Sequence, residues 1–330
     1  PYDTPPHDAA YFAQHLEALA QYYRTVSEGE VEIEYAVFPR APEAAYTMPR
    51  SALSFGNGRS TAEIGTKWVE LISAALDSAA ADPSGPCFAE FNSFLILHAG
   101  VGHETGELND IRSVYLDNTD LEAFLELPLQ AGEGNCGRVV RDAWILPESL
   151  SNTGRAGMNG LFAKFFGHQL GLIGLSNFAE GLPALGAWSL MDVGANVSGF
   201  VLQDSLQFTV GFVPPHPMAW SKARLGWIDP LVVTRDTTVR LVATDRLSDL
   251  PKAVRIPVTD TEYFLLENRV QRANRGLPQG VSSPLPAEET VWIDAAAVDF
   301  SRDDRAGVWQ NVEEYDAFVP GSGVLVWHVD

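Results

Sequence analysis

The chain has 330 residues, of which 46% are hydrophobic and 20% charged, a composition typical of a globular rather than a disordered protein. Its formal net charge is −21. Because this charge repels phosphate backbones and anionic lipid headgroups, binding to nucleic acid or to a membrane surface is disfavoured. The sequence has no apolar run of about 18 residues, so we expect no membrane insertion.

The first hundred residues alternate between helical and strand-like patterns. Apolar residues at helical spacing predict a helix over 10–25, and alternating hydrophobicity predicts a strand over 31–38. Ser60 and Glu63 form a capping box that starts a second helix with one apolar stripe. Residues 91–100 predict a buried strand that ends in a glycine-rich loop. A helix followed by a buried strand favours an α/β layer.

The middle of the chain is less regular. Residues 101–160 are predicted to be rich in loops, and helical spacing returns over 161–173. Residues 186–199 form a turn region punctuated by glycine, and 214–230 predict a short helix between prolines.

The pattern changes near residue 230. The stretches that follow predict strands separated by turns: "LVVTRDTTVRLVAT", "AVRIPV", "EYFLLENRV" and "GVLVWHVD". We therefore predict an α+β protein with an α/β-type unit at 1–230 and a β-rich unit at 231–330, which could continue beyond the given chain.

The chain has two cysteines, Cys87 and Cys136. In an oxidising compartment they could form one disulfide, and otherwise they would be two free buried thiols. Spacing alone does not decide between these alternatives. Neither cysteine lies in a CxxC pair or beside a histidine, so a redox or thiol-nucleophile role has little support.

The stretch "KFFGHQLGLIGLSNF" has the spacing of a zinc-binding helix. In the H-E-x-x-H motif, two histidines one turn apart bind the metal, and the glutamate acts as general base on the bound water. In the extended motif a glycine follows the second histidine by three residues, and a third ligand follows it by six.

With His168 as the second histidine, Gly171 occupies the glycine position of the extended motif. Lys164 stands at the first ligand position, Phe165 at the general-base position and Gly174 at the third ligand position. Lysine has no acceptor for the metal, and phenylalanine cannot take a proton from water. A lone histidine here would ordinarily be a packed or hydrogen-bonded core residue.

Several separate stretches resemble, in the same order, the secreted metallopeptidases of the immune inhibitor A family. They are "YYRTVSEG" (22–29), "LILHAGVGHETG" (95–106), "FGHQLGLIGL" (166–175), "GAWSLMDVG" (186–194), "WSKARLGWIDP" (220–230), "EYFLLENR" (262–269) and "GSGVLVWHVD" (321–330). They are distributed along nearly the whole chain, from residue 22 to residue 330, although each stretch alone is a weak signal.

This resemblance implies a zincin-like catalytic-type domain followed by a β-sandwich-like region, and a secreted or cell-surface protein. It also implies zinc at the helix, calcium as a possible stabilising ion, and Met191 as the methionine beneath the metal. Only His168 carries over among the zinc ligands, and the catalytic glutamate does not. Zinc is therefore not expected here.

The resulting hypothesis is a pseudopeptidase that binds a protein or peptide partner, or takes part in an extracellular assembly. The alternative is an active secreted zinc endopeptidase with an unusual ligand set. For Lys164 the hypothesis places the ammonium in the former metal cavity, among oxygen acceptors. The alternative is that its side chain extends to solvent.

Other candidates are weaker. His98, His103 and Glu104 could form a substitute metal site with His168, but the resemblance already accounts for His98 and Glu104 as scaffold. Calcium ligands could come from residues 116–122, from 299–307 or from Asp82, although none has the spacing of a calcium loop.

Three polar residues stand in otherwise apolar segments. They are Asp192, Glu267 and Arg269, and each is more simply explained by a structural ion pair or a loop cap. Ser189 lies in no G-x-S-x-G turn, so a serine hydrolase has no support.

Overall fold

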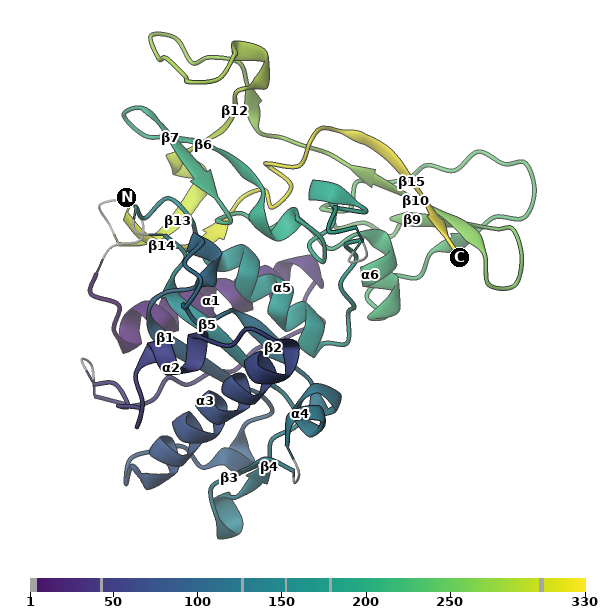
Figure 1. Ribbon diagram of the computed structural model, residues 1–330. Coiled ribbons are helices and arrows are strands. Elements are labelled where there is room, and N and C mark those ends of the chain that lie inside the picture. Colours follow the sequence, from purple (N-terminus) through teal and green to yellow (C-terminus); the bar gives the residue numbers. More distant parts are fainter. Residues whose placement is uncertain (1–4, 42–43, 126–127, 152, 178–179, 303–305) are drawn as a thin grey trace. The chain divides into compact units, whose positions relative to one another are not determined.

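The computed structural model describes residues 5–41, 44–125, 128–151, 153–177, 180–302 and 306–330 (Figure 1). The chain divides into two compact units of mixed α and β structure. Unit 1 comprises Pro1–Leu16 and Tyr35–Ala156, and unit 2 comprises Glu17–Glu34 and Gly157–Asp330. The boundary predicted near residue 230 falls inside unit 2 and stays a prediction.

Unit 1 is built on a three-stranded sheet. Its order is β1 (Phe94–Val101), β5 (Ala143–Ser149), β2 (Val114–Leu116), with β1 parallel and β2 antiparallel to β5. β1 confirms the strand predicted over 91–100, but not its burial, since only Ile96 is buried and Ala99 and Gly100 are exposed. The central strand β5 lies in the region predicted to be rich in loops, and no strand was predicted there. Since nearly every residue of β5 is buried, it lacks the alternation that marks a half-exposed strand.

The long helix α3 (Thr61–Ala81) confirms the predicted capping box. Ser60 Oγ accepts from the Glu63 N–H, and the Glu63 carboxylate accepts from the Ser60 N–H. Its apolar stripe packs with the sheet in one core, which includes Val69, Ile72, Leu76, Ile96, Leu116 and Ile145. Burial of these side chains holds the helix on the sheet.

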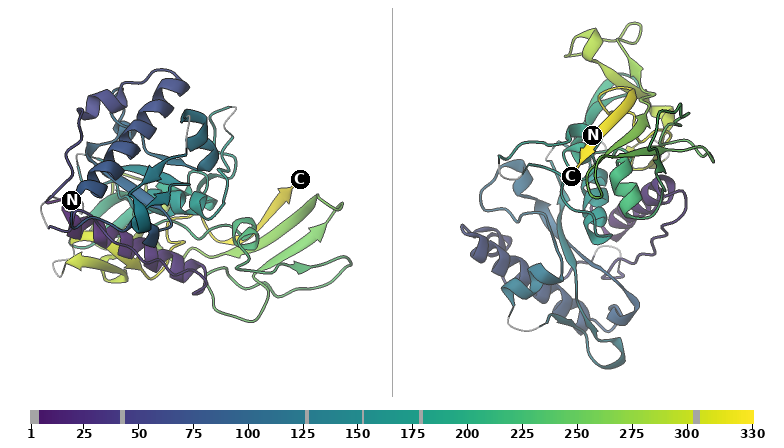
Figure 2. Two further views of the ribbon diagram at one scale, coloured as in Figure 1. Left: turned by 90° about the horizontal axis from the view of Figure 1, so that it is seen from below. Right: turned by 90° about the vertical axis from the view of Figure 1, so that its right-hand side faces the viewer.

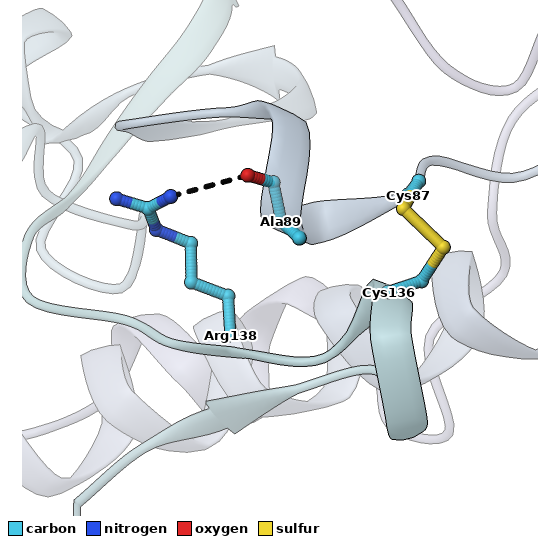
Figure 3. Close-up of a disulfide and its surroundings, with 4 residues drawn as sticks. All are labelled: Cys87, Ala89, Cys136 and Arg138. Carbon is cyan, nitrogen blue, oxygen red and sulfur yellow. Dashed lines mark hydrogen bonds between the residues drawn. A yellow bond between two sulfur atoms is a disulfide. The ribbon is translucent and has the colours of Figure 1, made fainter.

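The remaining elements of unit 1 are short. They are α2 (Ala52–Gly56), η1 (Phe88–Glu90), η2 (His103–Thr105), α4 (Asn118–Phe124), β3 (Gln130–Ala131), η3 (Gly134–Cys136) and β4 (Arg138–Val139). Cys87 and Cys136 form a disulfide that joins η1 to η3 (Figure 3). Arg138 Nη1 donates to the Ala89 carbonyl oxygen at 3.3 Å, so a hydrogen bond spans the same joint.

Helix α1 (Ala9–Val26) confirms the first predicted helix and contributes residues to both units. The strand predicted over 31–38 is wrong, because residues 31–37 form no strand and none of them is buried. Alternating hydrophobicity specifies a strand only where one face can be covered.

Unit 2 contains the four-stranded sheet β15-β10-β9-β8, which packs against the short helix α6 (Ala219–Arg224), as Figure 2 shows. Its strands are β8 (Leu231–Val232), β9 (Ala253–Pro257), β10 (Tyr263–Arg269) and β15 (Gly323–Val329). The last three confirm predicted strands. The strand predicted over 231–244 is mostly wrong, since only β8 forms and residues 233–241 leave no side chain buried.

A second sheet in unit 2 has the order β11-β12-β6-β7. Its strands are β6 (Ser198–Leu202), β7 (Leu206–Val210), β11 (Asn274–Arg275) and β12 (Val291–Asp294), and β13 (Val298–Arg302) pairs separately with β14 (Ala306–Val312). Four short 3₁₀ turns complete the unit: η4 (Gly186–Trp188), η5 (Gly194–Asn196), η6 (Ala287–Glu289) and η7 (Ala295–Ala297). The parallel pairing of β6 with β12 joins segments from both sides of residue 230.

Helix α5 (Asn159–Gln169) ends earlier than the predicted helix over 161–173. Gly171 adopts a φ of 93° and donates to the His168 carbonyl at 2.9 Å, and Leu172 donates to the Gly167 carbonyl at 2.9 Å. This is a Schellman motif, in which a left-handed glycine satisfies the last carbonyls of a helix. The glycine therefore turns the chain where helical spacing alone predicts continuation.

Candidate functional site

Helix α5 carries Lys164, Phe165 and His168. Lys164 and His168 are four residues apart and so lie on one face of the helix. Phe165 is buried, with 9% of its surface exposed, and its ring is 6.5 Å from the His168 ring. The residues at the first ligand position and at the general-base position are therefore a cation and an apolar ring.

Met191 packs directly against α5. It is almost fully buried, and a Cβ placed on Gly167 would lie 2.8 Å from its Sδ, so a larger residue in the helix would displace the Met191 side chain. Leu175 N–H donates to the Met191 carbonyl at 2.9 Å, which ties the turn after α5 to the Met191 segment. The assignment of Met191 as the methionine beneath a metal stays a prediction.

The Lys164 side chain turns toward this segment. Its Nζ donates to the main-chain oxygen of Asp192 at 2.9 Å. Burial lowers the pKa of Lys164, and the Asp192 carboxylate partly offsets that effect. The ammonium thus has an oxygen acceptor on the residue after Met191, and its placement in a former metal cavity stays a prediction.

The Asp192 carboxylate organises the adjacent loop. It accepts from the Ser176 hydroxyl at 2.6 Å and from the N–H groups of residues 184–186 at 2.9, 2.7 and 2.7 Å. Burial raises the pKa of Asp192, but the hydroxyl and the N–H donors outweigh it, and the pKa lies below its ordinary value. Asp192 is a loop cap whose charge is compensated by four donors.

His168 is held by the turn that ends α5. Its Nδ1 lies 3.0 Å from the Leu172 carbonyl oxygen, so the proton on Nδ1 is donated there. Burial lowers the pKa of His168, the Leu172 carbonyl opposes this, and Lys164 adds to the lowering. Gly174, at the third ligand position, has no side chain to offer a metal.

These residues do not fit a catalytic zinc ion. Zinc in such a site takes three side-chain lone pairs and keeps one position open. Here an ammonium engaged with the Asp192 carbonyl stands at one ligand position and a glycine at another. Throughout the described ranges, no group of three His, Cys, Asp or Glu side chains is arranged to hold a metal ion.

The alternative metal ligands have other partners. His103 Nδ1 lies 2.8 Å from the Glu107 carbonyl, and the Glu104 carboxylate accepts from Ser113 N–H at 3.1 Å. His98 Nδ1 lies 2.9 Å from the Ala99 carbonyl. All three are in unit 1, whereas His168 is in unit 2. A metal site that combines them with His168 therefore stays a prediction.

Two of the calcium candidates have local structural roles. Asp117 and Asp120 form the capping box of α4. Asp82 accepts from the Tyr46 hydroxyl at 2.9 Å and from Ser84 N–H at 2.8 Å. The third candidate, 299–307, lies partly outside the described residues. Calcium as a cofactor stays a prediction.

A buried charged network in unit 2 was only partly predicted. Arg269 is fully buried and donates to Asp316 through Nε and Nη2, at 2.6 and 2.5 Å. Its other donors reach the carbonyls of Trp188 and His216, each at 3.1 Å. Burial raises the pKa of Asp316, but the Arg269 guanidinium reverses this and holds it below its ordinary value. Arg269 thereby fixes the segment that leads to Met191.

Glu267, on the same strand, is a helix cap as well as part of an ion pair. Its carboxylate accepts from the Ala219 N–H at 3.0 Å and from Trp327 Nε1 at 2.8 Å, and lies 3.8 Å from Arg269. Ser189 has no exposed surface, so its hydroxyl is not accessible to a substrate. The structural roles expected for Glu267 and Arg269 are those observed.

Lys222 is the second cation of this network and was not predicted. It is 1% exposed, and its Nζ contacts His216 Nδ1 at 3.2 Å and Thr244 Oγ1 at 3.2 Å. Burial, together with repulsion from Arg269, lowers the pKa of Lys222 to about 8. In the unfolded chain the pKa of lysine is about 10.4.

A pH dependence of stability follows from Lys222. Between these two pKa values the unfolded chain binds a proton that the folded protein releases, so stability rises with pH. From about pH 8 to about pH 9.5 this group alone is expected to add about 1.5 kcal/mol to the free energy of unfolding. The free energy of unfolding of the wild type and of Lys222→Met is measured with urea at both pH values. The contribution of Lys222 is the difference between the two proteins in how much this free energy changes with pH. Equal slopes for the wild type and Lys222→Met would contradict the prediction.

Comparisons with known proteins find no match to any family model, curated protein or solved structure. In the described part of the chain, no helix is long and apolar enough to cross a membrane.

Proposed function

We propose that this chain is a catalytically inactive metallopeptidase-like protein of the immune inhibitor A type. Its zincin-like domain would occupy residues 1–230, with a β-rich region at 231–330. In this proposal it acts outside the cell by binding a protein or peptide, or as part of an assembly. The disulfide between Cys87 and Cys136 is compatible with an oxidising compartment.

The observation that carries the proposal is the Lys164 ammonium. It donates to the Asp192 carbonyl from the position where a zinc peptidase would have its first histidine. An ammonium has three donors and no lone pair, so it cannot bind a cation and repels one. It supplies positive charge where the ancestral site would have held a metal.

Phe165 supports the same conclusion. Metal-assisted peptide hydrolysis needs a base that takes a proton from the attacking water. Phe165 is buried in α5 at that position and has no atom that accepts a proton. Loss of a ligand weakens metal binding, and loss of the base prevents proton transfer from the attacking water. A single compensating residue would therefore not restore hydrolysis.

The alternative is an active zinc endopeptidase with an unusual ligand set. In its favour, His168 remains at a ligand position and Met191 packs against the same helix. The two functions differ in one property that is simple to measure, because only the active enzyme needs stoichiometric zinc.

The experiment measures metal content by elemental mass spectrometry, and casein cleavage on the same purified sample. We expect no stoichiometric zinc and no cleavage. Zinc near one per chain together with chelator-sensitive cleavage would overturn the proposal.

A variant that rebuilds the motif tests the zincin-like geometry separately. Lys164→His, Phe165→Glu and Gly174→His are combined, and the variant is expected to take up zinc that a chelator removes. Adding His168→Ala to this variant should abolish uptake. Failure of the folded triple variant to bind zinc would contradict the zincin-like arrangement, even if the wild type is inactive.

A further inference from the structure

Lys164 forms no ion pair with any carboxylate in the described part of the chain. Its Nζ has one described hydrogen bond, to the Asp192 carbonyl, and no described carboxylate lies within ion-pair distance of it. Two other buried cations of unit 2 are paired with carboxylates, Arg269 with Asp316 and Lys252 with Glu28, whereas Lys222 contacts His216 and Thr244. An ammonium offers three donors, so Lys164 has donors left for a ligand.

The nearest carboxylate is not available to neutralise it. Both oxygens of Asp192 are directed to Ser176 and to the N–H groups of residues 184–186. The Asp192 carboxylate therefore has hydrogen-bond donors of its own in the loop. The Lys164 ammonium contacts the main-chain oxygen of Asp192 and not its carboxylate. Lys164 is only partly buried.

Exposed apolar side chains occur in the segments whose main chain is hydrogen-bonded to α5 or to Asp192. Ile173 is 54% exposed, Leu182 is 55% exposed and Val193 is 38% exposed. The main chain links these segments, since Leu175 donates to Met191, and Asn177 and Leu182 are bridged. Exposed apolar residues near a fixed charge are typical of a binding site in which the polar group sets orientation.

We propose that this site binds the carboxylate of a peptide, with the Lys164 ammonium donating to the carboxylate and the apolar residues contacting the neighbouring side chains. This inference rests on the proposed function, because it takes the former metal position to serve binding. The carboxylate could be a glutamate or aspartate side chain or the C-terminus of the peptide.

The charge of the whole chain limits the ligand further. A net charge of −21 repels polyanions at long range, whereas one carboxylate flanked by apolar residues carries little charge to repel. Arg224, whose Nε donates to the Gly171 carbonyl at 3.4 Å, adds a second cation at the end of α5. The chemistry therefore favours a mostly apolar peptide with a single carboxylate.

The experiment uses three synthetic peptides with one apolar sequence. The first is capped at both ends and neutral, the second is capped and contains one glutamate, and the third has a free C-terminal carboxylate. Binding to the full chain is measured by ligand-detected NMR titration. At least one carboxylate peptide is expected to bind about tenfold more tightly than the neutral one, and added salt is expected to reduce the difference.

Variants assign the effect to Lys164. Lys164→Met should remove the difference between the peptides, and Lys164→Arg should keep most of it. The matched control is Lys67→Met, because Lys67 is another part-buried lysine that donates to a main-chain carbonyl, that of Ser54 at 2.7 Å. This control should bind like the wild type.

The outcomes separate this inference from the proposed function. Equal binding of all three peptides, no binding of any, or an undiminished preference in Lys164→Met would each overturn the carboxylate site. None of these results would show that the protein binds zinc or cleaves casein, because metal content and cleavage are measured in a separate experiment. The preference of the two charged peptides relative to each other identifies the source of the carboxylate.

Discussion

Replacing Asp316 by asparagine is expected to lower the free energy of unfolding by about 3–5 kcal/mol. Asp316 is 1% exposed and is the bidentate acceptor of the fully buried Arg269. Asparagine keeps the shape but removes the charge, so Arg269 would remain buried with Glu267, at 3.8 Å, as the remaining anion near it among the described residues. A buried charge without its partner is strongly destabilising, far more than its pairing is stabilising. Urea unfolding followed by tryptophan fluorescence measures the change.

The matched control is Asp245→Asn, since Asp245 also pairs with an arginine of unit 2. That partner, Arg272, has 24% of its side chain exposed and also pairs with Glu314 at 3.0 Å. Solvent and the second carboxylate can stabilise Arg272, so the expected loss is about 1 kcal/mol or less. If both variants lose the same free energy, the Arg269–Asp316 pair does not have the role assigned to it.

Local signals were sufficient for some elements of the fold. The capping box at Ser60 and the apolar stripe that follows it specify α3 without reference to the rest of the chain. The strands β9, β10 and β15 also follow from short runs of β-forming residues bounded by turns.

Elements that depend on distant partners were not predicted correctly. β5 is covered on both faces, so its apolar run shows no periodicity. Residues 31–37 alternate as a strand would, but no apolar face is buried there. Several of residues 233–241 are β-branched, which favours a strand, but none of their side chains is buried. In each case the deciding factor is tertiary burial, which the local sequence does not contain.

For the candidate site, spacing identified which residues replace the zinc ligands, because the helical positions of Lys164 and His168 are fixed by sequence. It did not identify the acceptor of Lys164, since a main-chain carbonyl has no sequence signal. Alternation along β10 places Leu265, Glu267 and Arg269 on one face, which could have shown that both charges are buried. The partner Asp316 is 47 residues away from Arg269 and had no such signal.

Removing the disulfide by the double substitution Cys87→Ala and Cys136→Ala is expected to lower the free energy of unfolding of unit 1 by about 2–4 kcal/mol. The bond joins residues 49 positions apart, and the unfolded chain gains the entropy of that loop when the link is absent. The same mechanism predicts a larger dependence of stability on urea, because the unlinked chain exposes more surface when it unfolds.

The control is Arg138→Ala, which removes the hydrogen bond to Ala89 across the same joint but leaves the covalent link (Figure 3). An exposed hydrogen bond contributes about 1 kcal/mol or less, so this variant should remain close to the wild type in both stability and urea dependence. Wild-type protein unfolded in the presence of a reductant should behave like the double variant. If the double variant instead matches Arg138→Ala, the joint between η1 and η3 is held by its packing, and the disulfide adds nothing to the folding of unit 1.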